Sequence, residues 1–231
     1  MDNLVRFERL IGESNLNKVK LQTVVVLGLG GVGGYATESL ARSGIGTLVL
    51  VDYDVVDVSN LNRQIIATKD TIGEYKTACF QRRIKTINEE CVVKTINEKI
   101  TKDNIHLLFE ENPNYIVDAC DFLEAKETLI LECIKRKVKF ISSMGTGNKM
   151  DPSKLKIMDI RKTSYDPIAK KLRKFAVENK INKKIPVVCS TEPPRKISSP
   201  VGSNAFVPAT AGLLCTSYII NDIVGDISDF S

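Results

Sequence analysis

Five glycines lie within a seven-residue stretch near the start of the chain: Gly28, Gly30, Gly31, Gly33 and Gly34. An apolar run at 24–27 precedes them and helix-forming residues at 35–43 follow, which is the pattern of a buried strand, a tight turn and a helix. Because glycine has no Cβ atom, the backbone N–H groups of such a turn can approach a phosphate closely, and the helix adds its positive N-terminal end. The pattern predicts a nucleotide site. Its spacing fits NAD as well as ATP, and glycines that serve packing alone are the alternative.

Acidic residues follow the second predicted strand. The apolar run at 47–51 ends at Asp52, and Asp54 comes two residues later. A carboxylate at the tip of this strand, about 20 residues past the glycines, suits the ribose hydroxyls of a nucleotide. These acids therefore belong to the same predicted site as the glycine turn.

Polar and cationic residues favour one nucleotide over the other. Asn60, Arg63 and Gln64 come after the acids, and Lys76 lies near the start of a predicted helix. Two cations and an acid suit a triphosphate whose pyrophosphate leaves, because they neutralise the charge that develops on the bridging oxygens. Asp121 is a candidate ligand of Mg²⁺, which proteins hold through one or two carboxylates plus phosphates. Each cation alone is more typical of a solvated surface, but their shared position favours ATP.

The elements that must position these residues alternate between strands and helices. This order predicts an α/β fold with a doubly wound, Rossmann-like sheet and helices on both faces. Predicted strands cover 24–27, 47–51, 91–96, 114–119 and 138–142, and predicted helices cover 35–43, 74–88 and 124–137. A C-terminal extension adds strands at 155–160 and 185–189, helices at 167–177 and 209–220, and a proline-rich loop at 192–202. We expect an N-terminal helical arm (1–22), an ATP-binding core (23–147) and a basic C-terminal subdomain (148–231) that continues the same fold.

Charge is unevenly distributed over the 231 residues, whose net charge is +5. Residues 149–196 hold 14 Lys and Arg against 5 Asp and Glu, whereas the rest of the chain is slightly acidic. Such a segment is either a solvated surface or a footprint for a nucleic-acid backbone. The predicted helix 167–177 contributes four candidate phosphate contacts: Lys170, Lys171, Arg173 and Lys174.

Composition points to a cytoplasmic protein. The six cysteines form no C-x-x-C pair, which argues against a zinc ribbon or a redox motif, and the charged first nine residues do not resemble a signal peptide. The apolar run at 209–220 is shorter than the roughly 20 residues of a membrane span, so we expect a core helix. His106 is expected to be structural. Cys189 ends an apolar strand, where a buried thiol is commoner than a nucleophile, and it is left out of the catalytic set.

Several of these motifs together resemble the adenylating domain of the ubiquitin-activating (ThiF-like) superfamily. The matching segments are GLGGVGG, VDYD, SNLNRQ, Lys76 and DACD, and the resemblance covers about residues 6–147. It implies that Asp52 binds the ribose of ATP and that Asp121 holds Mg²⁺. It also implies that the phosphates are bound by Asn60, Arg63 and Lys76.

The segment RFERLI at 6–11, a predicted amphipathic helix, resembles the N-terminal RYxRQ element of this superfamily. The second arginine of that element reaches across a dimer into the ATP site of the partner. Arg9 is the matching position in this chain. The resemblance therefore implies a homodimer in which Arg9 completes the neighbouring site.

The second half of the chain, from 142 to 194 and on to the apolar helix, resembles one subgroup, the tRNA threonylcarbamoyladenosine dehydratases. The resemblance implies ATP-dependent cyclisation of threonylcarbamoyladenosine in tRNA through an adenylated carboxylate. A carboxylate is already nucleophilic, so this step requires positioning and charge neutralisation and no general base. The basic segment supports a tRNA partner independently. Two other classes stay open: an adenylyltransferase of a ubiquitin-like sulfur-carrier protein, whose usual zinc pairs are missing, and an NAD-binding oxidoreductase or regulatory module. A sulfur-relay protein also stays open as a partner.

Overall fold

A computed structural model describes residues 3–197 and 199–225 of the chain. Within these residues, one seven-stranded sheet has the order β3-β2-β1-β4-β5-β7-β6. The strands are β1 (Thr23–Leu27), β2 (Thr47–Val51), β3 (Val92–Ile96), β4 (Tyr115–Asp118), β5 (Lys139–Ser143), β6 (Leu155–Asp159) and β7 (Pro186–Ser190). Neighbouring strands are parallel except β6, which pairs with β7 in the antiparallel direction. The predicted doubly wound α/β fold is confirmed.

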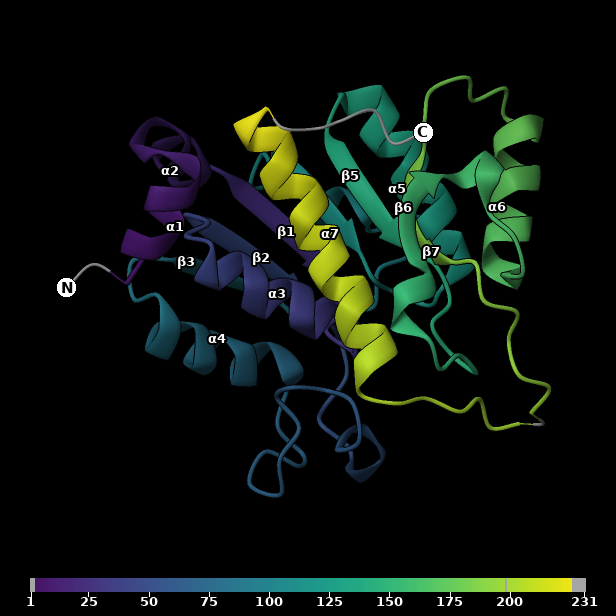
Figure 1. The fold of residues 1–231 in the computed structure, drawn as a ribbon, viewed down its shortest axis with the longest axis horizontal. Helices are drawn as coiled ribbons and strands as arrows, with labels where there is room; N and C mark the ends of the chain where they lie inside the picture. Colours follow the sequence, from purple (N-terminus) through teal and green to yellow (C-terminus); the bar gives the residue numbers. More distant parts are fainter. Residues whose placement is uncertain (1–2, 198, 226–231) are drawn as a thin grey trace.

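Helices cover both faces of this sheet (Figure 1). They are α1 (Val5–Ile11), α2 (Glu13–Lys20), α3 (Gly33–Arg42), α4 (Lys76–Ile87), α5 (Leu123–Arg136), α6 (Pro167–Glu178) and α7 (Phe206–Val224), with 3₁₀ helices η1 (Val58–Asn60), η2 (Ile105–Phe109), η3 (Pro152–Lys154) and η4 (Ile160–Lys162). One core cluster joins the sheet to α2, α3, α4 and α7, and a second joins it to η2, α5 and α6. Val24 and Val26 point into the first cluster and Val25 into the second, which explains why β1 is a continuous apolar run.

The helix α7 is longer than the predicted range 209–220 and crosses α3 at close range. A Cβ atom at Gly212 would lie 2.2 Å from the carbonyl oxygen of Val32, so only glycine permits this crossing. Among the described helices, α7 is long and apolar enough to span a membrane by length and composition alone. Its residues Val207, Ala211 and Cys215 pack into the core beside the sheet, as expected of a core helix.

The C-terminal extension continues the sheet of the core. β7 pairs with β5, and β6 forms the edge beyond it, so residues after 148 add two strands to the same layer. The described residues of the loop 192–202 form neither helix nor strand. Residues 1–2, 198 and 226–231 lie outside the described part of the chain. The division into an arm, a core and a C-terminal subdomain stays a prediction.

The N-terminal arm consists of α1 and α2, and the sequence predicted only the first of them. Gly12, with φ of 84°, separates the two helices. The arm packs where β2 and β3 begin, because Leu4 contacts Gly44 and the Asn3 side chain donates to the carbonyl of Ile87 at 2.9 Å. It therefore lies at the edge of the sheet opposite to the carboxyl ends of the strands.

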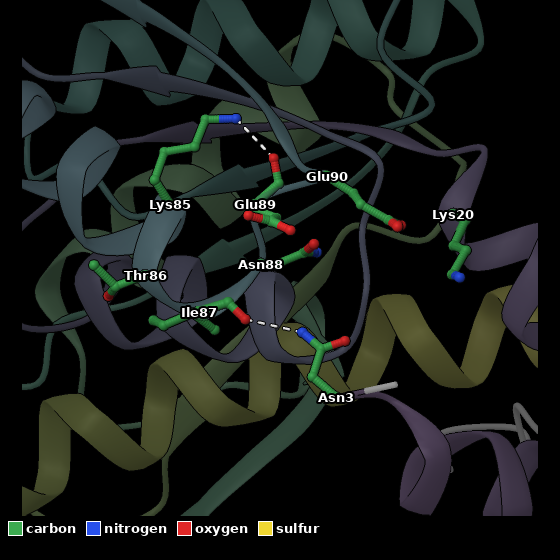
Figure 2. A pocket seen from close by; sticks show the side chains of 8 residues that line it. All are labelled: Asn3, Lys20, Lys85, Thr86, Ile87, Asn88, Glu89 and Glu90. Carbon is green, nitrogen blue, oxygen red and sulfur yellow. Dashed lines mark hydrogen bonds between the residues drawn. The ribbon is translucent and has the colours of Figure 1, made fainter. Parts of the chain in front are cut away.

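A polar hollow of about 520 Å³ lies at this same edge (Figure 2). Two lysines line it, Lys20 and Lys85, and Lys85 already donates to the carbonyls of Glu89 at 2.9 Å and Cys91 at 3.0 Å. No glycine lines the hollow, and Lys85 is bound to backbone oxygens. The opposite edge, where the strands end, is the better candidate for the nucleotide.

Candidate functional site

A cavity of about 590 Å³ opens at the carboxyl ends of the central strands. β1 pairs with β2 on one side and with β4 on the other, so this is the switch point at which doubly wound sheets bind ligands. The cavity is lined by most of the residues predicted from sequence: Gly28, Gly30, Gly31, Asp52, Asp54, Asn60, Arg63, Gln64, Lys76 and Asp121. Gly33 and Arg9 do not line it.

The glycine turn packs closely against other backbone segments of the same chain and is open on the side of the cavity. Gly28 has φ of 86°, and a Cβ atom there would lie 2.9 Å from the carbonyl oxygen of Ala119. A Cβ atom at Gly33 would lie 1.8 Å from the carbonyl oxygen of Gly28, so Gly33 serves the packing of helix on strand and not the cavity wall. At Gly30 the nearest atom to such a Cβ is Nε2 of Gln64, at 3.8 Å. The turn is therefore open on the side where a phosphate would approach.

Asp52 links the glycine turn to the end of β2. Its carboxylate accepts hydrogen bonds from the backbone N–H of Leu29 at 2.6 Å and of Asp54 at 2.9 Å. Burial raises the pKa of Asp52, and the nearby Lys76 opposes that rise. Carboxylate oxygens accept more than one hydrogen bond, so Asp52 retains capacity for ribose hydroxyls.

Two cations flank the glycine turn in different environments. Lys76 is only 4% exposed, and its Nζ lies 2.8 Å from Oδ2 of Asp54 and 3.7 Å from Oδ2 of Asp52. From the sequence alone, Lys76 could have been a solvent-exposed surface residue. Its burial excludes that alternative. Arg63 is partly exposed and donates to the carbonyl of Ser59 at 2.7 Å, while its stem lies beside Gly31.

The amides near Arg63 are more enclosed than the arginine itself. Asn60 and Gln64 are buried, and Oε1 of Gln64 has no hydrogen-bond partner among the described residues. An unpaired acceptor on the wall of a cavity favours a polar ligand, because burying it alone costs free energy. Both amides thus belong to the same polar wall as the cations.

Asp121 lines the cavity and forms no hydrogen bond or ion pair within the described residues. With Asp54 and Asp52 it creates a negative region: the charge of Asp54, followed by burial and the charge of Asp121, raises the pKa of Tyr53. No group of three His, Cys, Asp or Glu that could hold a metal occurs in the described chain. A Mg²⁺ ion at Asp121 would therefore take its other ligands from nucleotide phosphates and water, which is how proteins commonly bind it.

A buried ion pair behind this wall was missed by sequence reasoning. Lys126 is fully buried, and its Nζ donates to Oδ2 of Asp118 at 3.0 Å, to Oγ of Ser142 at 3.1 Å and to the carbonyl of Ser143 at 3.0 Å. Burial alone would lower the pKa of Lys126, but the charge of Asp118 holds it above its usual value. Asp118 also accepts from the backbone N–H of Cys120 at 3.3 Å, so the pair shapes the turn that carries Asp121.

Three further residues from the sequence analysis have definite positions. Cys189 is 1% exposed inside β7, and burial raises its pKa to about 11, so it is a structural thiol. His106 lies in η2. Arg173 is half-buried and its guanidinium donates to the carbonyl of Thr163 at 3.0 Å, unlike its exposed neighbours Lys170 and Lys171, and its contact with a phosphate stays a prediction. The partner, Thr163, lies ten residues earlier in the chain, and no sequence pattern indicates this contact.

Arg9 lies on the exposed side of α1, at the edge of the sheet opposite to the cavity. It forms no ion pair within the described residues, not even with the nearby acid Glu13 at the start of α2. A single chain therefore gives this arginine no role in its own site. Its action in a partner's site stays a prediction.

Known proteins are similar to this chain over nearly its whole length. A model described as the ThiF family matches residues 2–214. The tRNA threonylcarbamoyladenosine dehydratase of Bacillus subtilis is 40% identical over 240 residues, covering 96% of this chain and 94% of that protein. The crystal structure of E. coli tRNA N6-threonylcarbamoyladenosine dehydratase in complex with ATP superimposes with a TM-score of 0.91 at 33% identity, covering 96% of this chain and 94% of that one. Its complex with AMP gives a TM-score of 0.90 at 34% identity, covering 96% and 93%.

Proposed function

The chain belongs to the ThiF family, and we propose that it is an ATP-dependent tRNA threonylcarbamoyladenosine dehydratase. One observation carries this proposal: similarity to such dehydratases extends over nearly the whole chain, including the basic extension, and a solved relative binds ATP in the same fold. The cavity supports it, because a glycine turn, a carboxylate suited to the ribose (Asp52) and two cations lie together there. The reaction converts threonylcarbamoyladenosine in tRNA to its cyclic hydantoin form.

In the first step, the threonyl carboxylate attacks the α-phosphate of ATP, a P–O bond forms and pyrophosphate leaves. Arg63 and Lys76 flank the glycine turn, where they neutralise charge on the phosphate oxygens as it develops. Lys76 has three donors on its ammonium, so it can bind a phosphate while Asp54 holds it in place. The residues of the cavity position and neutralise, and none is required to remove a proton from the nucleophile.

In the second step, a nitrogen within the same modification attacks the adenylated carbonyl carbon. A C–N bond forms, AMP leaves with one oxygen of the former carboxylate, and the proton of the nitrogen passes to solvent. The nucleoside thereby loses the elements of water. Mg²⁺, held by Asp121 and the phosphates, would supply positive charge to the leaving pyrophosphate.

The decisive experiment supplies ATP, MgCl₂ and tRNA that carries threonylcarbamoyladenosine. We expect AMP, pyrophosphate and cyclic nucleoside in equal amounts, and no AMP with unmodified tRNA. AMP formed only with a ubiquitin-like carrier protein would support an adenylyltransferase instead. Binding of NAD without any ATP-dependent product would support the oxidoreductase alternative.

The remaining partners are part of this proposal. Exposed lysines on α6 and around β6 suit a tRNA backbone, and a tRNA substrate supports a cytoplasmic enzyme. A homodimer is supported by the position of Arg9, which faces away from the cavity of its own chain. Cys189, the thiol considered for sulfur transfer, is buried and gives a sulfur-relay partner no support.

A further inference from the structure

The cavity has two chemically different ends. At one end Arg63 lies beside Gly31 of the glycine turn; at the other, Lys99 lies over Phe122 and follows β3, which pairs with β2 on the side away from β1. Backbone N–H groups and cations bind phosphates, so the triphosphate belongs at the glycine end. The base of the nucleotide must then lie toward the other end, beyond Asp52.

At that end, a lysine lies over two aromatic rings. Nζ of Lys99 is 4.6 Å from the ring centroid of Phe122 and 5.9 Å from that of Tyr53. The backbone of this segment is held by Asn104, which donates to the carbonyl of Lys99 at 3.1 Å and accepts from the N–H of Thr101 at 2.7 Å. Within the described residues Lys99 forms no ion pair, so ring faces and solvent are the surroundings of its ammonium. Ring contacts and no ion pair therefore hold the ammonium, whereas hydrogen bonds to Asn104 hold the backbone.

The ring of Phe122 is available for stacking. It is 36% exposed, and it precedes α5 at the turn that Asp118 shapes. Because Lys99 and Phe122 both line the cavity, the ring face that carries the ammonium is a face that a ligand can reach. A planar base and the ammonium would then compete for the same surface.

We propose that Phe122 is the platform on which the purine base of the nucleotide stacks, and that Lys99 is a gate that the base displaces. This inference rests on the proposed function of the cavity as an ATP site. Stacking of a base on an aromatic ring is a strong contact, whereas an exposed ammonium over a ring is a weak one, so the exchange favours the base. Phe122 thus determines nucleotide affinity without touching the phosphates.

The platform is tested by binding ATP and, separately, inorganic tripolyphosphate, which has no base. We expect Phe122→Ala to weaken ATP binding about tenfold and to leave tripolyphosphate binding unchanged, and we expect Phe122→Tyr to retain both. Unchanged ATP affinity in Phe122→Ala would overturn the proposal. An equal loss of affinity for ATP and for tripolyphosphate would also overturn it, because Phe122 would then only shape the turn before α5 and not bind the base. Failure of the unsubstituted protein to bind ATP would instead contradict the proposed function.

The gate is tested with Lys99→Met, which keeps the stem and removes the charge. Without the competing ammonium we expect ATP to bind about two- to fivefold more tightly than it does to Lys102→Met. Lys102 is exposed, lies nearby and does not line the cavity, so this control removes the same charge from the surface. Weaker ATP binding in Lys99→Met than in the control would show that the ammonium binds the nucleotide, and the gate would be rejected.

Discussion

The nucleotide cavity and the basic end of the sheet hold their charges in opposite ways. In the cavity, Lys76 is buried and paired with Asp54, and Lys126 is buried behind the wall with Asp118. At the basic end, Lys170 and Lys171 on α6 are exposed, and the ion pair of Lys174 with Glu178 is long, at 3.6 Å, and open to solvent.

This difference relates to the kind of ligand each region suits. Buried and paired groups keep a fixed geometry, which a single reacting phosphate requires. Exposed lysines on flexible stems bind a charge that is spread along a polymer, where position matters less than the number of phosphates bound. We therefore expect substitutions in the cavity to change turnover strongly, and substitutions on α6 to weaken RNA binding and flatten its salt dependence without changing ATP affinity.

The largest effect is expected from the cations of the cavity. Arg63→Ala and Lys76→Ala should each lower the turnover number by about 100-fold or more, because each removes charge that stabilises the transition state. AMP formation under saturating ATP measures this. Lys69→Ala, an exposed position on the same connecting segment, is the control and should stay active. Near-normal turnover in both cavity variants would contradict the ATP assignment.

The next effect concerns the buried pair behind the cavity. Lys126→Met should lower the free energy of unfolding by about 3–5 kcal/mol, because it leaves the carboxylate of Asp118 buried without its cation. Adding Asp118→Leu removes that charge as well and should restore most of the loss. Denaturant titration measures both, with the exposed Lys135→Met on the same helix as control. Equal stability of Lys126→Met and the control would show that the pair contributes nothing.

These two predictions differ in how far sequence could reach them. The bounds of β2 were predicted without error, because a strand covered on both faces is a continuous apolar run. Most cavity residues were found because they follow strand ends at the same edge, and Lys76 was found because it begins the next helix. Lys126 was missed because its partners, Asp118 and Ser142, are brought together only by the pairing of β4 with β5.

Short-range packing set the other limits of sequence reasoning. α2 was missed because its eight residues bury only Leu16 and Val19, which is too little to give a clear pattern. Arg173 looked like its exposed neighbours because a basic helix does not reveal which cation turns inward. In each case the missing information was a contact between segments rather than a local preference.

A third prediction tests whether Arg9 of one subunit acts in the ATP site of a second subunit. Arg9→Ala and Arg63→Ala should each be inactive, and mixing the two should return about a quarter of the normal activity, since half of the dimers are hybrids with one intact site. Mixing Arg6→Ala, from the same helix, with Arg63→Ala gives the comparison for a cation outside the shared site. Mass spectrometry must show that subunits exchange. Hybrids without recovered activity would mean that Arg9 does not act across a dimer.

A fourth prediction concerns the free carboxylate of the cavity. Asp121→Asn should raise the Mg²⁺ concentration for half-maximal AMP formation about tenfold, at the lower end of what changes around a metal commonly cost. Asp103→Asn, exposed and outside the cavity, should leave it unchanged. Identical Mg²⁺ titrations for the two variants would exclude Asp121 as a ligand.

The smallest effect is expected at the basic end, where the comparison is most easily broken. Replacing Lys170, Lys171 and Lys174 with Gln should lower the salt dependence of tRNA binding by up to about three units of slope, roughly one for each lysine that no longer neutralises a phosphate, and leave ATP affinity unchanged. Arg173 is left in place because its guanidinium holds Thr163.

The matched control replaces three exposed lysines elsewhere with Gln: Lys18, Lys69 and Lys102. Both triples remove the same charge, so a flatter slope in the α6 variant alone locates the RNA on this helix. Equal slopes in the two variants would show that α6 is a solvated face, and a drop in ATP affinity with the α6 variant would show that the two regions are not separate.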